Sequence, residues 1–291
     1  MDMRAIIMGL IFALMWSSAF SSARIIVADA SPLFSLALRF LISGILGVII
    51  ARAMGQSWRL TRPQWYATIL FGVCQNALYL GLNFVAMQTI QASLAAIIAS
   101  TMPLLVALAS WLLLGERLKP QGILGLIAGF VGAGIIMGTR IGAGVDLTGV
   151  MLCGIGVLAL TFATLAVRGA TSGGNFMMIV GLQMLVGSAL LFIAAPFFET
   201  IRISPTWPLV AAFAYTTLVP GLAATLIWFL LLDRIGPIRA ATFHFLTPVF
   251  GVAIAAVLLG EPIGAWDGIG VLIVTFGILS VQLSRRPAPA K

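Results

Sequence analysis

Chemically active side chains are scarce in this sequence, and one group of them recurs at helical spacing within residues 65–87. The group consists of Gly72, Asn76, Tyr79 and Asn83. Their spacing of four, three and four positions predicts that they share one face of a helix. Two amides and a phenol face lipid only at a high free-energy cost. This polar face therefore either lines a cavity or hydrogen-bonds to neighbouring helices.

Three of the 13 prolines interrupt long apolar stretches, and they are Pro103, Pro220 and Pro248. A proline has no N–H to donate to the carbonyl four residues earlier. The carbonyls released in this way belong to Ala99, Thr216 and His244. Each kink is either a fixed shape repaired by a neighbouring hydroxyl, or a hinge whose free carbonyl faces a substrate ammonium group. We predict the three prolines to be hinges.

Aromatic side chains and one imidazole can contact the apolar part of a ligand. Trp16 and Phe20 lie in the first apolar stretch, Phe243 precedes the single histidine, His244, and a further tryptophan, Trp228, lies within residues 207–232. His244 is either a neutral core group or the one membrane side chain that exchanges a proton near neutral pH. The predicted substrate-binding residues are Trp16, Phe20, Asn76, Tyr79, Asn83, Ala99, Phe243 and His244.

Charged side chains within the apolar stretches are nearly absent. All eight carboxylates lie near the ends of these stretches or between them: Asp2, Asp29, Glu116, Asp146, Glu199, Asp233, Glu261 and Asp267. No acid is therefore placed to bind a cationic drug or to relay protons. Only Arg39 lies clearly inside, about 7 residues or roughly 10 Å of helix from one end, and it is expected to snorkel outward. A carrier of sugar phosphates or nucleotides would need several such cations.

The sequence contains no H-E-x-x-H motif, no pair of central acids and no Gly-Lys-Ser/Thr phosphate loop. We therefore predict neither an enzyme nor a metal site nor a cofactor, and we exclude ATP-driven transport by this chain alone. The net charge of +8 is spread singly over segment ends, so it does not form a surface for nucleic acid.

Composition requires a lipid environment. Charged residues make up 8% of the chain and hydrophobic residues 61%, whereas soluble domains are roughly 25% charged. Ten segments reach the roughly 20 residues that a ~30 Å hydrocarbon core needs. They cover residues 5–23, 32–53, 65–87, 91–114, 120–138, 147–167, 175–196, 207–232, 237–259 and 265–284. Their apolar runs are continuous rather than alternating, which predicts an all-α membrane protein and excludes a barrel.

Two copies of one unit make up the chain. Residues 95–116 and 240–261 are similar helices with a central proline and a Gly-Glu end, and their matching positions are 145 residues apart. We predict a first five-helix repeat at 1–145 and a second at 146–291, which together form one transport domain. Five is an odd number, so the repeats should be inverted. With both termini cytoplasmic, most of the 16 basic residues lie on the inner side, as the positive-inside rule expects. The first segment also resembles a signal peptide, but its counterpart inside the second copy favours a membrane helix.

The segments WSSAF at 16–20 and LRF at 38–40, together with the two Pro-centred helices, resemble the EamA-type transporters of the drug/metabolite transporter superfamily. Within that family the chain is most similar to bacterial exporters of aromatic and other hydrophobic amino acids. The resemblance implies a transporter in the bacterial inner membrane. It also implies alternating access around a central cavity that uses helices one, three, four, six, eight and nine. The expected partners are the lipid bilayer and a neutral or zwitterionic amphipathic substrate. Other small metabolites and lipophilic toxic compounds are alternative substrates.

Glycine pairs four residues apart predict close helix contacts. They are Gly125/Gly129, Gly134/Gly138 and Gly264/Gly268. Such contacts form within one bundle or between subunits, so both a monomer and a weak homodimer fit the sequence.

Overall fold

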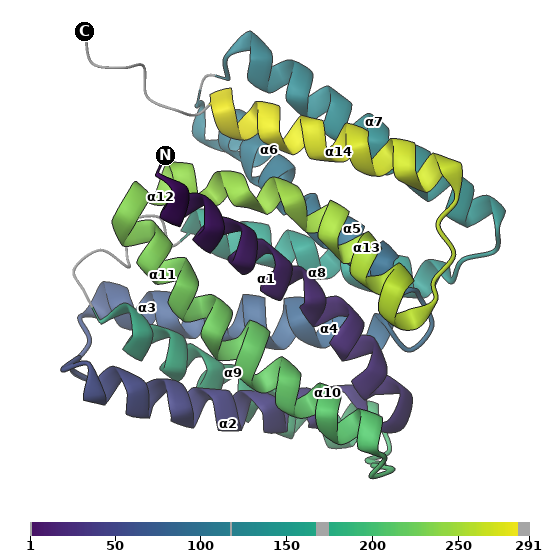
Figure 1. Cartoon of the computed structure of the whole chain (residues 1–291). Coiled ribbons are helices and arrows are strands. Elements are labelled where there is room, and N and C mark those ends of the chain that lie inside the picture. Colours follow the sequence, from purple (N-terminus) through teal and green to yellow (C-terminus); the bar gives the residue numbers. More distant parts are fainter. Residues whose placement is uncertain (1, 117, 167–174, 285–291) are drawn as a thin grey trace, which may run out of the picture. The chain divides into compact units, whose positions relative to one another are not determined.

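The computed structural model describes residues 2–116, 118–166 and 175–284 (Figure 1). Within these residues ten helical segments are long and apolar enough to cross a membrane, which confirms the prediction. The spans are Met3–Asp29, Pro32–Ala53, Arg62–Ala86, Ala92–Leu114, Pro120–Gly142, Leu147–Ala166, Phe176–Phe198, Trp207–Leu232, Arg239–Leu259 and Ala265–Ser284.

Six spans are single helices: α1 (Met3–Asp29), α2 (Pro32–Ala53), α7 (Pro120–Gly142), α8 (Leu147–Ala166), α9 (Phe176–Phe198) and α14 (Ala265–Ser284). The third span passes through a π-helix, in the order α3 (Arg62–Phe71), η1 (Gly72–Leu80) and α4 (Gly81–Ala86). The fourth is divided into α5 (Ala92–Ser100) and α6 (Met102–Leu114). The eighth span passes from α10 (Trp207–Leu218) through the π-helix η2 (Val219–Ala223) to α11 (Ala224–Ile235). The ninth contains a 3₁₀ turn, in the order α12 (Pro237–Ala241), η3 (Thr242–Leu246) and α13 (Thr247–Leu259).

The helices form two compact units. The described residues of Met1–Ser21, Gln91–Leu147 and Ala224–Lys291 form unit 1, and Ser22–Ile90 with Thr148–Ala223 form unit 2. Each unit takes helices from both halves of the sequence. The packing units are therefore a different division of the chain from the two sequence repeats.

In unit 1, helices α7 and α14 lie side by side, and they contact each other closely at glycines (Figure 1). A Cβ at Gly277 would lie 2.6 Å from the Gly125 carbonyl oxygen, and one at Gly132 would lie 2.8 Å from the Gly270 carbonyl oxygen. Gly125 and Gly270 are 145 residues apart, as are Gly132 and Gly277. The two contacts are thus related by a local twofold axis, and the equivalent helices run antiparallel. This is the geometry of inverted repeats.

Of the predicted glycine contacts, one pair packs within the unit, and the others meet no other helix among the described residues of this chain. A Cβ at Gly277 would lie 2.5 Å from the Gly129 nitrogen, so the Gly125/Gly129 pair packs within the unit. Added Cβ atoms at Gly134, Gly138 and Gly268 would have no neighbour within 4 Å. These glycines lie on helix faces turned away from the partner helix, because only one face of α7 can contact α14.

In unit 2, α2 and α9 pair in the same antiparallel manner. The Glu199 carboxylate at the end of α9 accepts hydrogen bonds from the Leu33 and Phe34 amides, at 3.0 and 2.8 Å. At the other end of the pair, Gln56 Oε1 accepts from the Met178 amide at 3.0 Å. Leu33 and Met178 are 145 residues apart. A residue that follows each helix therefore caps the first turn of the other, as the repeat predicts.

Candidate functional site

Unit 1 holds a cluster of aromatic rings around the single histidine. We define the His244 cluster as Phe12 and Trp16 of α1, Trp228 of α11 and His244 of η3. The imidazole centroid lies 5.3 Å from Phe12, 6.1 Å from Trp16 and 5.2 Å from Trp228. Phe12 also contacts Trp228 at 4.7 Å. All three rings meet the imidazole edge-on, an arrangement that aromatic pairs prefer to a face-to-face sandwich.

The members of the His244 cluster differ in exposure. Phe12 is 2% exposed and forms its base, whereas Trp16, Trp228 and His244 are half-buried. Within the described residues no group hydrogen-bonds to the imidazole ring. The cluster can therefore offer two indole surfaces and two unoccupied ring nitrogens to a planar apolar ligand. Of its members, the sequence predicted Trp16 and His244 as binding residues. Phe12 was not predicted from the sequence, because nothing distinguishes it from the other apolar residues of α1.

A packed core next to the cluster holds η3 in place. Phe243 is buried with Ala5, Leu231 and Ala240. A Cβ at Gly9 would lie 2.3 Å from the Phe243 ring, so α1 needs a glycine at this point. Phe243 thus packs in the core beside His244. Phe20, the other predicted aromatic residue, is 6% exposed on α1.

The polar stripe of the third span is divided between two neighbouring helices of unit 2. Asn76 donates to the Gln183 carbonyl of α9 at 2.8 Å. Asn83 instead accepts from the Cys153 thiol of α8 at 3.3 Å, and its amide donates to the Tyr79 carbonyl. The two contacts are thus made with different helices, and η1 is a π-helix instead of the predicted α-helix. A π-helix has more residues per turn than the 3.6 that the spacing argument assumed.

Both asparagine amides thus make contacts within unit 2, the second of the two roles left open by the sequence. Asn76 and Asn83 are each 1% exposed, and Tyr79 is 5% exposed. A Cβ at Gly156 of α8 would lie 3.2 Å from the Tyr79 carbonyl oxygen, so α8 approaches the Tyr79 backbone closely.

The three prolines lie at junctions between helical segments. Pro103 lies in the first turn of α6, just after the break at Thr101. Pro248 lies in the first turn of α13, and Pro220 lies within the π-helical turn η2. One released carbonyl, that of His244, finds another donor. The Thr247 amide bonds to the His244 carbonyl, so the prediction that this carbonyl is free is wrong; the tighter 3₁₀ turn supplies the donor. Near Pro103, the Thr101 amide points to the Ala99 and Ile98 carbonyls.

Arg39 does not snorkel, contrary to the prediction. Its side chain is buried in unit 2 with 5% exposure. A Cβ at Gly221 of η2 would lie 3.5 Å from Arg39 Nη2. The guanidinium group therefore extends toward the π-helical turn of the eighth span instead of toward the end of α2.

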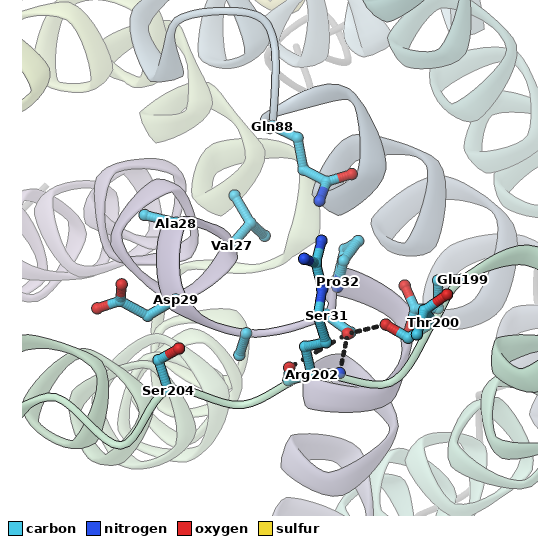
Figure 2. Close-up of a pocket in the computed structure, with 11 residues that line it drawn as sticks. Val27, Ala28, Asp29, Ser31, Pro32, Gln88, Glu199, Thr200, Arg202 and Ser204 are labelled. Atoms are coloured by element: carbon cyan, nitrogen blue, oxygen red, sulfur yellow. Dashed lines mark hydrogen bonds between the residues drawn. The ribbon is translucent and has the colours of Figure 1, made fainter.

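A polar pocket of about 350 Å³ lies where α1 ends and α2 begins in unit 2 (Figure 2). Ser31 joins its walls: the Ser31 hydroxyl donates to the Thr200 carbonyl at 2.9 Å and accepts from the Arg202 amide at 2.7 Å. Asp29 accepts a hydrogen bond from the Thr206 hydroxyl. In Figure 2 the Arg202 side chain extends into the pocket toward Gln88. None of the described residues that line this pocket is aromatic.

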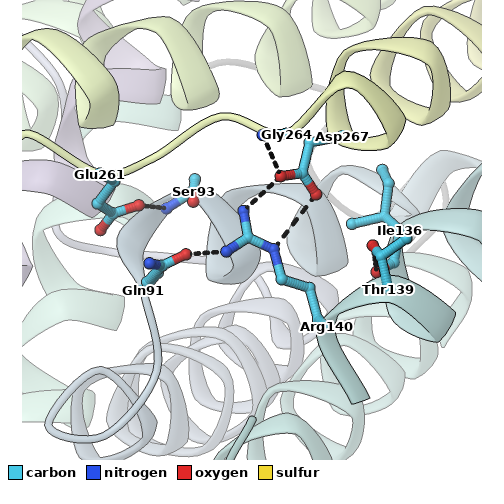
Figure 3. Close-up of polar contacts among 8 residues, drawn as sticks. All are labelled: Gln91, Ser93, Ile136, Thr139, Arg140, Glu261, Gly264 and Asp267. Carbon is cyan, nitrogen blue, oxygen red and sulfur yellow. Dashed lines mark hydrogen bonds and ion pairs between the residues drawn. The ribbon is translucent and has the colours of Figure 1, made fainter. Parts of the chain in front are cut away.

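A second polar network fixes the start of α5 in unit 1 (Figure 3). Arg140 forms a two-pronged ion pair with Asp267, at 2.9 and 3.2 Å, and also donates to Gln91. The Glu261 carboxylate accepts from the Ala92 and Ser93 amides at 2.7 and 3.0 Å. The fourth span is thus held at its first turn, ahead of its break at Thr101. The sequence predicted Glu261 only as the end of a repeated motif.

Comparison with known proteins agrees with this architecture. A model of the EamA-like transporter family matches residues 3–138 and 147–283, one match for each repeat. The "Uncharacterized transporter YvbV" of Bacillus subtilis is 25% identical over 278 residues, which cover 95% of this chain and 91% of YvbV. The "Uncharacterized inner membrane transporter YedA" of Escherichia coli K12 is 27% identical over 296 residues, covering 97% and 92%.

A solved structure titled "Crystal structure of protein" shares the fold, with a TM-score of 0.70, 22% identity and coverage of 97% of this chain and 98% of that one. Two family matches over nearly the whole chain, ten membrane-length helices and an inverted pairing of equivalent helices confirm the resemblance seen in the sequence. The chain belongs to the EamA-like transporter family and is a multi-pass membrane transporter built from two five-helix repeats.

Proposed function

We propose that this transporter exports aromatic and other hydrophobic amino acids across the bacterial inner membrane by alternating access, with both termini cytoplasmic. The inner-membrane location follows the name of its relative YedA. The observation that carries the substrate class is the His244 cluster. Two half-buried indoles and an imidazole that accepts no hydrogen bond from the described residues pack around a buried phenyl ring.

The cluster matches the chemistry of an aromatic side chain. Each additional aromatic pair contributes about 0.5–1.5 kcal/mol beyond the burial of its area. Trp16 and Trp228 supply the rings, and the His244 nitrogens can hydrogen-bond to a polar edge such as an indole N–H. The polar pocket near Ser31 lacks aromatic walls, so we place the aromatic part of the substrate at the His244 cluster.

The proposed site differs from the set of residues predicted from the sequence. Trp16 and His244 remain, and Phe12 and Trp228 join them. We assign Asn76 and Asn83 to helix packing because their amides are bonded within unit 2. Phe243 positions η3 from the core. Phe20, Tyr79 and Ala99 stay as predictions.

The broken spans supply the movement that we propose. Pro103, Pro220 and Pro248 stand at three junctions where a span changes its helical geometry. Regular backbone hydrogen bonding is interrupted there, so the adjoining segments can rotate at a lower cost than within a continuous helix. The first turn of α5 is fixed by Glu261, which leaves α6 as the part of the fourth span that moves.

Reconstituted protein tests the proposal. Proteoliposomes are loaded with radiolabelled tryptophan, phenylalanine, leucine or a cationic dye, with and without an imposed pH gradient. We expect saturable movement of tryptophan and phenylalanine. Trp228→Ala should raise the KM for tryptophan about 2- to 12-fold, the equivalent of one stacked pair. Trp207→Ala is the matched control, because Trp207 is 80% exposed at the start of α10.

Movement of the dye without movement of any amino acid would replace the proposal by efflux of lipophilic toxic compounds. If Trp228→Ala and Trp207→Ala changed the KM equally, the His244 cluster would not be the substrate-binding site. Movement of leucine but neither aromatic amino acid would restrict the substrates to aliphatic hydrophobic amino acids.

A further inference from the structure

Arg39 is a buried cation that pairs with no carboxylate in the part of the chain that the structure describes. It lies on α2 inside a membrane span and is 5% exposed. Its Nε atom is buried and has no hydrogen-bond partner. Among the described residues no carboxylate pairs with its guanidinium group. A charge held in a membrane interior without a counter-ion is costly, and such residues usually serve a ligand path.

Among the described residues, those around Arg39 supply one aromatic ring and several dipoles but no negative charge. The guanidinium carbon lies 5.3 Å from the centroid of the adjacent Phe40 ring. Three buried hydroxyl groups lie on the same stretches of α2 and α10, and each donates to a backbone carbonyl. The bonds are Ser43 to Thr217 at 3.3 Å, Thr216 to Ala212 at 2.6 Å and Thr217 to Phe213 at 2.7 Å. A single ring face and neutral dipoles compensate a desolvated cation only in part.

The turn η2 closes the space beside the guanidinium group. Gly221 brings bare backbone to this point, since an added Cβ would lie 3.0 Å from the Thr216 carbonyl oxygen and 3.3 Å from Ser43 Oγ. The turn is π-helical and contains Pro220, so it lacks the regular bonding of an α-helix. Single π-helical turns within α-helices are frequent at functional sites. A shift of η2 would expose Arg39 without unfolding α2.

We infer that Arg39 binds the carboxylate group of the transported molecule once η2 moves aside. The planar guanidinium group presents paired N–H donors that match the two oxygens of a carboxylate. This inference rests on the proposed transport function and deepens it, since it names the side chain that recognises the carboxylate. It depends on the carboxylate alone and not on the aromatic group.

Paired ligands that differ only in this charge test the inference. Each pair consists of a carboxylate and its uncharged amide: indole-3-propionate, 3-phenylpropionate and 4-methylpentanoate with their amides. Binding is measured by equilibrium binding to purified protein, and transport is measured in proteoliposomes. Wild-type protein should prefer the carboxylate in each bound pair. Arg39→Gln should weaken carboxylate binding about 10- to 100-fold and leave amide binding unchanged.

Arg52→Gln is the matched control, because it makes the same change on the same helix at an exposed position and should preserve the preference. Arg39→Lys keeps the charge but loses the paired donors, so it should retain a reduced preference. If Arg39→Gln does not fold, Arg39→Lys is compared with wild type instead. An Arg39→Lys preference equal to that of wild type would then overturn two-pronged binding.

The remaining outcomes separate this inference from the proposed substrate. A preference seen only for 4-methylpentanoate and lost in Arg39→Gln would support the Arg39 site while rejecting an aromatic substrate. A carboxylate preference that survives in folded Arg39→Gln would overturn the inference. So would a wild-type protein that binds amides and carboxylates equally.

Discussion

Glu261 and Ala92 lie 169 residues apart in the sequence, and the Glu261 carboxylate accepts a 2.7 Å hydrogen bond from the Ala92 amide. A second oxygen of the same group accepts from Ser93. The carboxylate thus accepts hydrogen bonds from two amides in the first turn of α5. Its negative charge also interacts favourably with the positive end of the α5 helix dipole. Gly260 makes this possible, because it ends α13 with φ +65° in the left-handed region and turns the chain toward α5.

Removing this cap should destabilise unit 1. We expect Glu261→Ala to cost about 0.5–2 kcal/mol of stability, as for other helix caps, and to lower the unfolding temperature in detergent. Glu261→Gln keeps an acceptor and should cost less. An alanine variant as stable as wild type would show that solvent satisfies the α5 amides.

Glycine contacts between α7 and α14 give a second prediction. Gly277→Ala places a methyl group 2.5 Å from the Gly129 nitrogen, where backbone must move. We expect a loss of about 1–3 kcal/mol in stability, measured by thermal unfolding. Gly138→Ala is the control. Its added methyl has no neighbour within 4 Å, so stability should stay the same or rise slightly. Equal stability of the two variants would contradict the packing of α7 on α14.

The proline junctions should matter for transport more than for folding. Pro103→Ala and Pro248→Ala restore a backbone donor and stiffen their spans, so the transport rate should fall while the protein stays folded. Pro120→Ala is the control, since Pro120 lies in the first turn of the continuous helix α7. Transport rates are compared in proteoliposomes at equal amounts of folded protein. Unchanged rates in both junction variants would mean that the breaks are fixed shapes.

Replacing Asn76 distinguishes a role in helix packing from a role in substrate binding. Its amide donates to the Gln183 carbonyl, so Asn76→Ala should lower thermal stability by about 0.6–2 kcal/mol, as for other hydrogen bonds between membrane helices. The KM for the transported amino acid should stay unchanged. A raised KM at unchanged stability would return Asn76 to the substrate site predicted from the sequence.

The sequence by itself determined the ten spans, the two repeats and their inversion. Backbone groups in lipid must be satisfied within each helix, so a span can be recognised from its own apolar residues without its neighbours. The constant offset between Pro103 and Pro248 shows the repeat directly, and an odd number of spans per repeat requires inversion. The Gly-Glu motif was visible for the same reason. Both Gly115 and Gly260 end a helix in the left-handed conformation, a local property.

Only the tertiary structure decided what each helix face contacts. The third span passes through the π-helix η1, and Asn76 meets α9 whereas Asn83 meets α8. Phe12 joined His244 because α1 and η3 pack together, and Arg39 turned toward Gly221 because the two residues meet across 182 positions of sequence. Residue spacing gives the angle of a side chain around an ideal helix axis. It does not give the neighbour of that side chain, which depends on how distant segments pack.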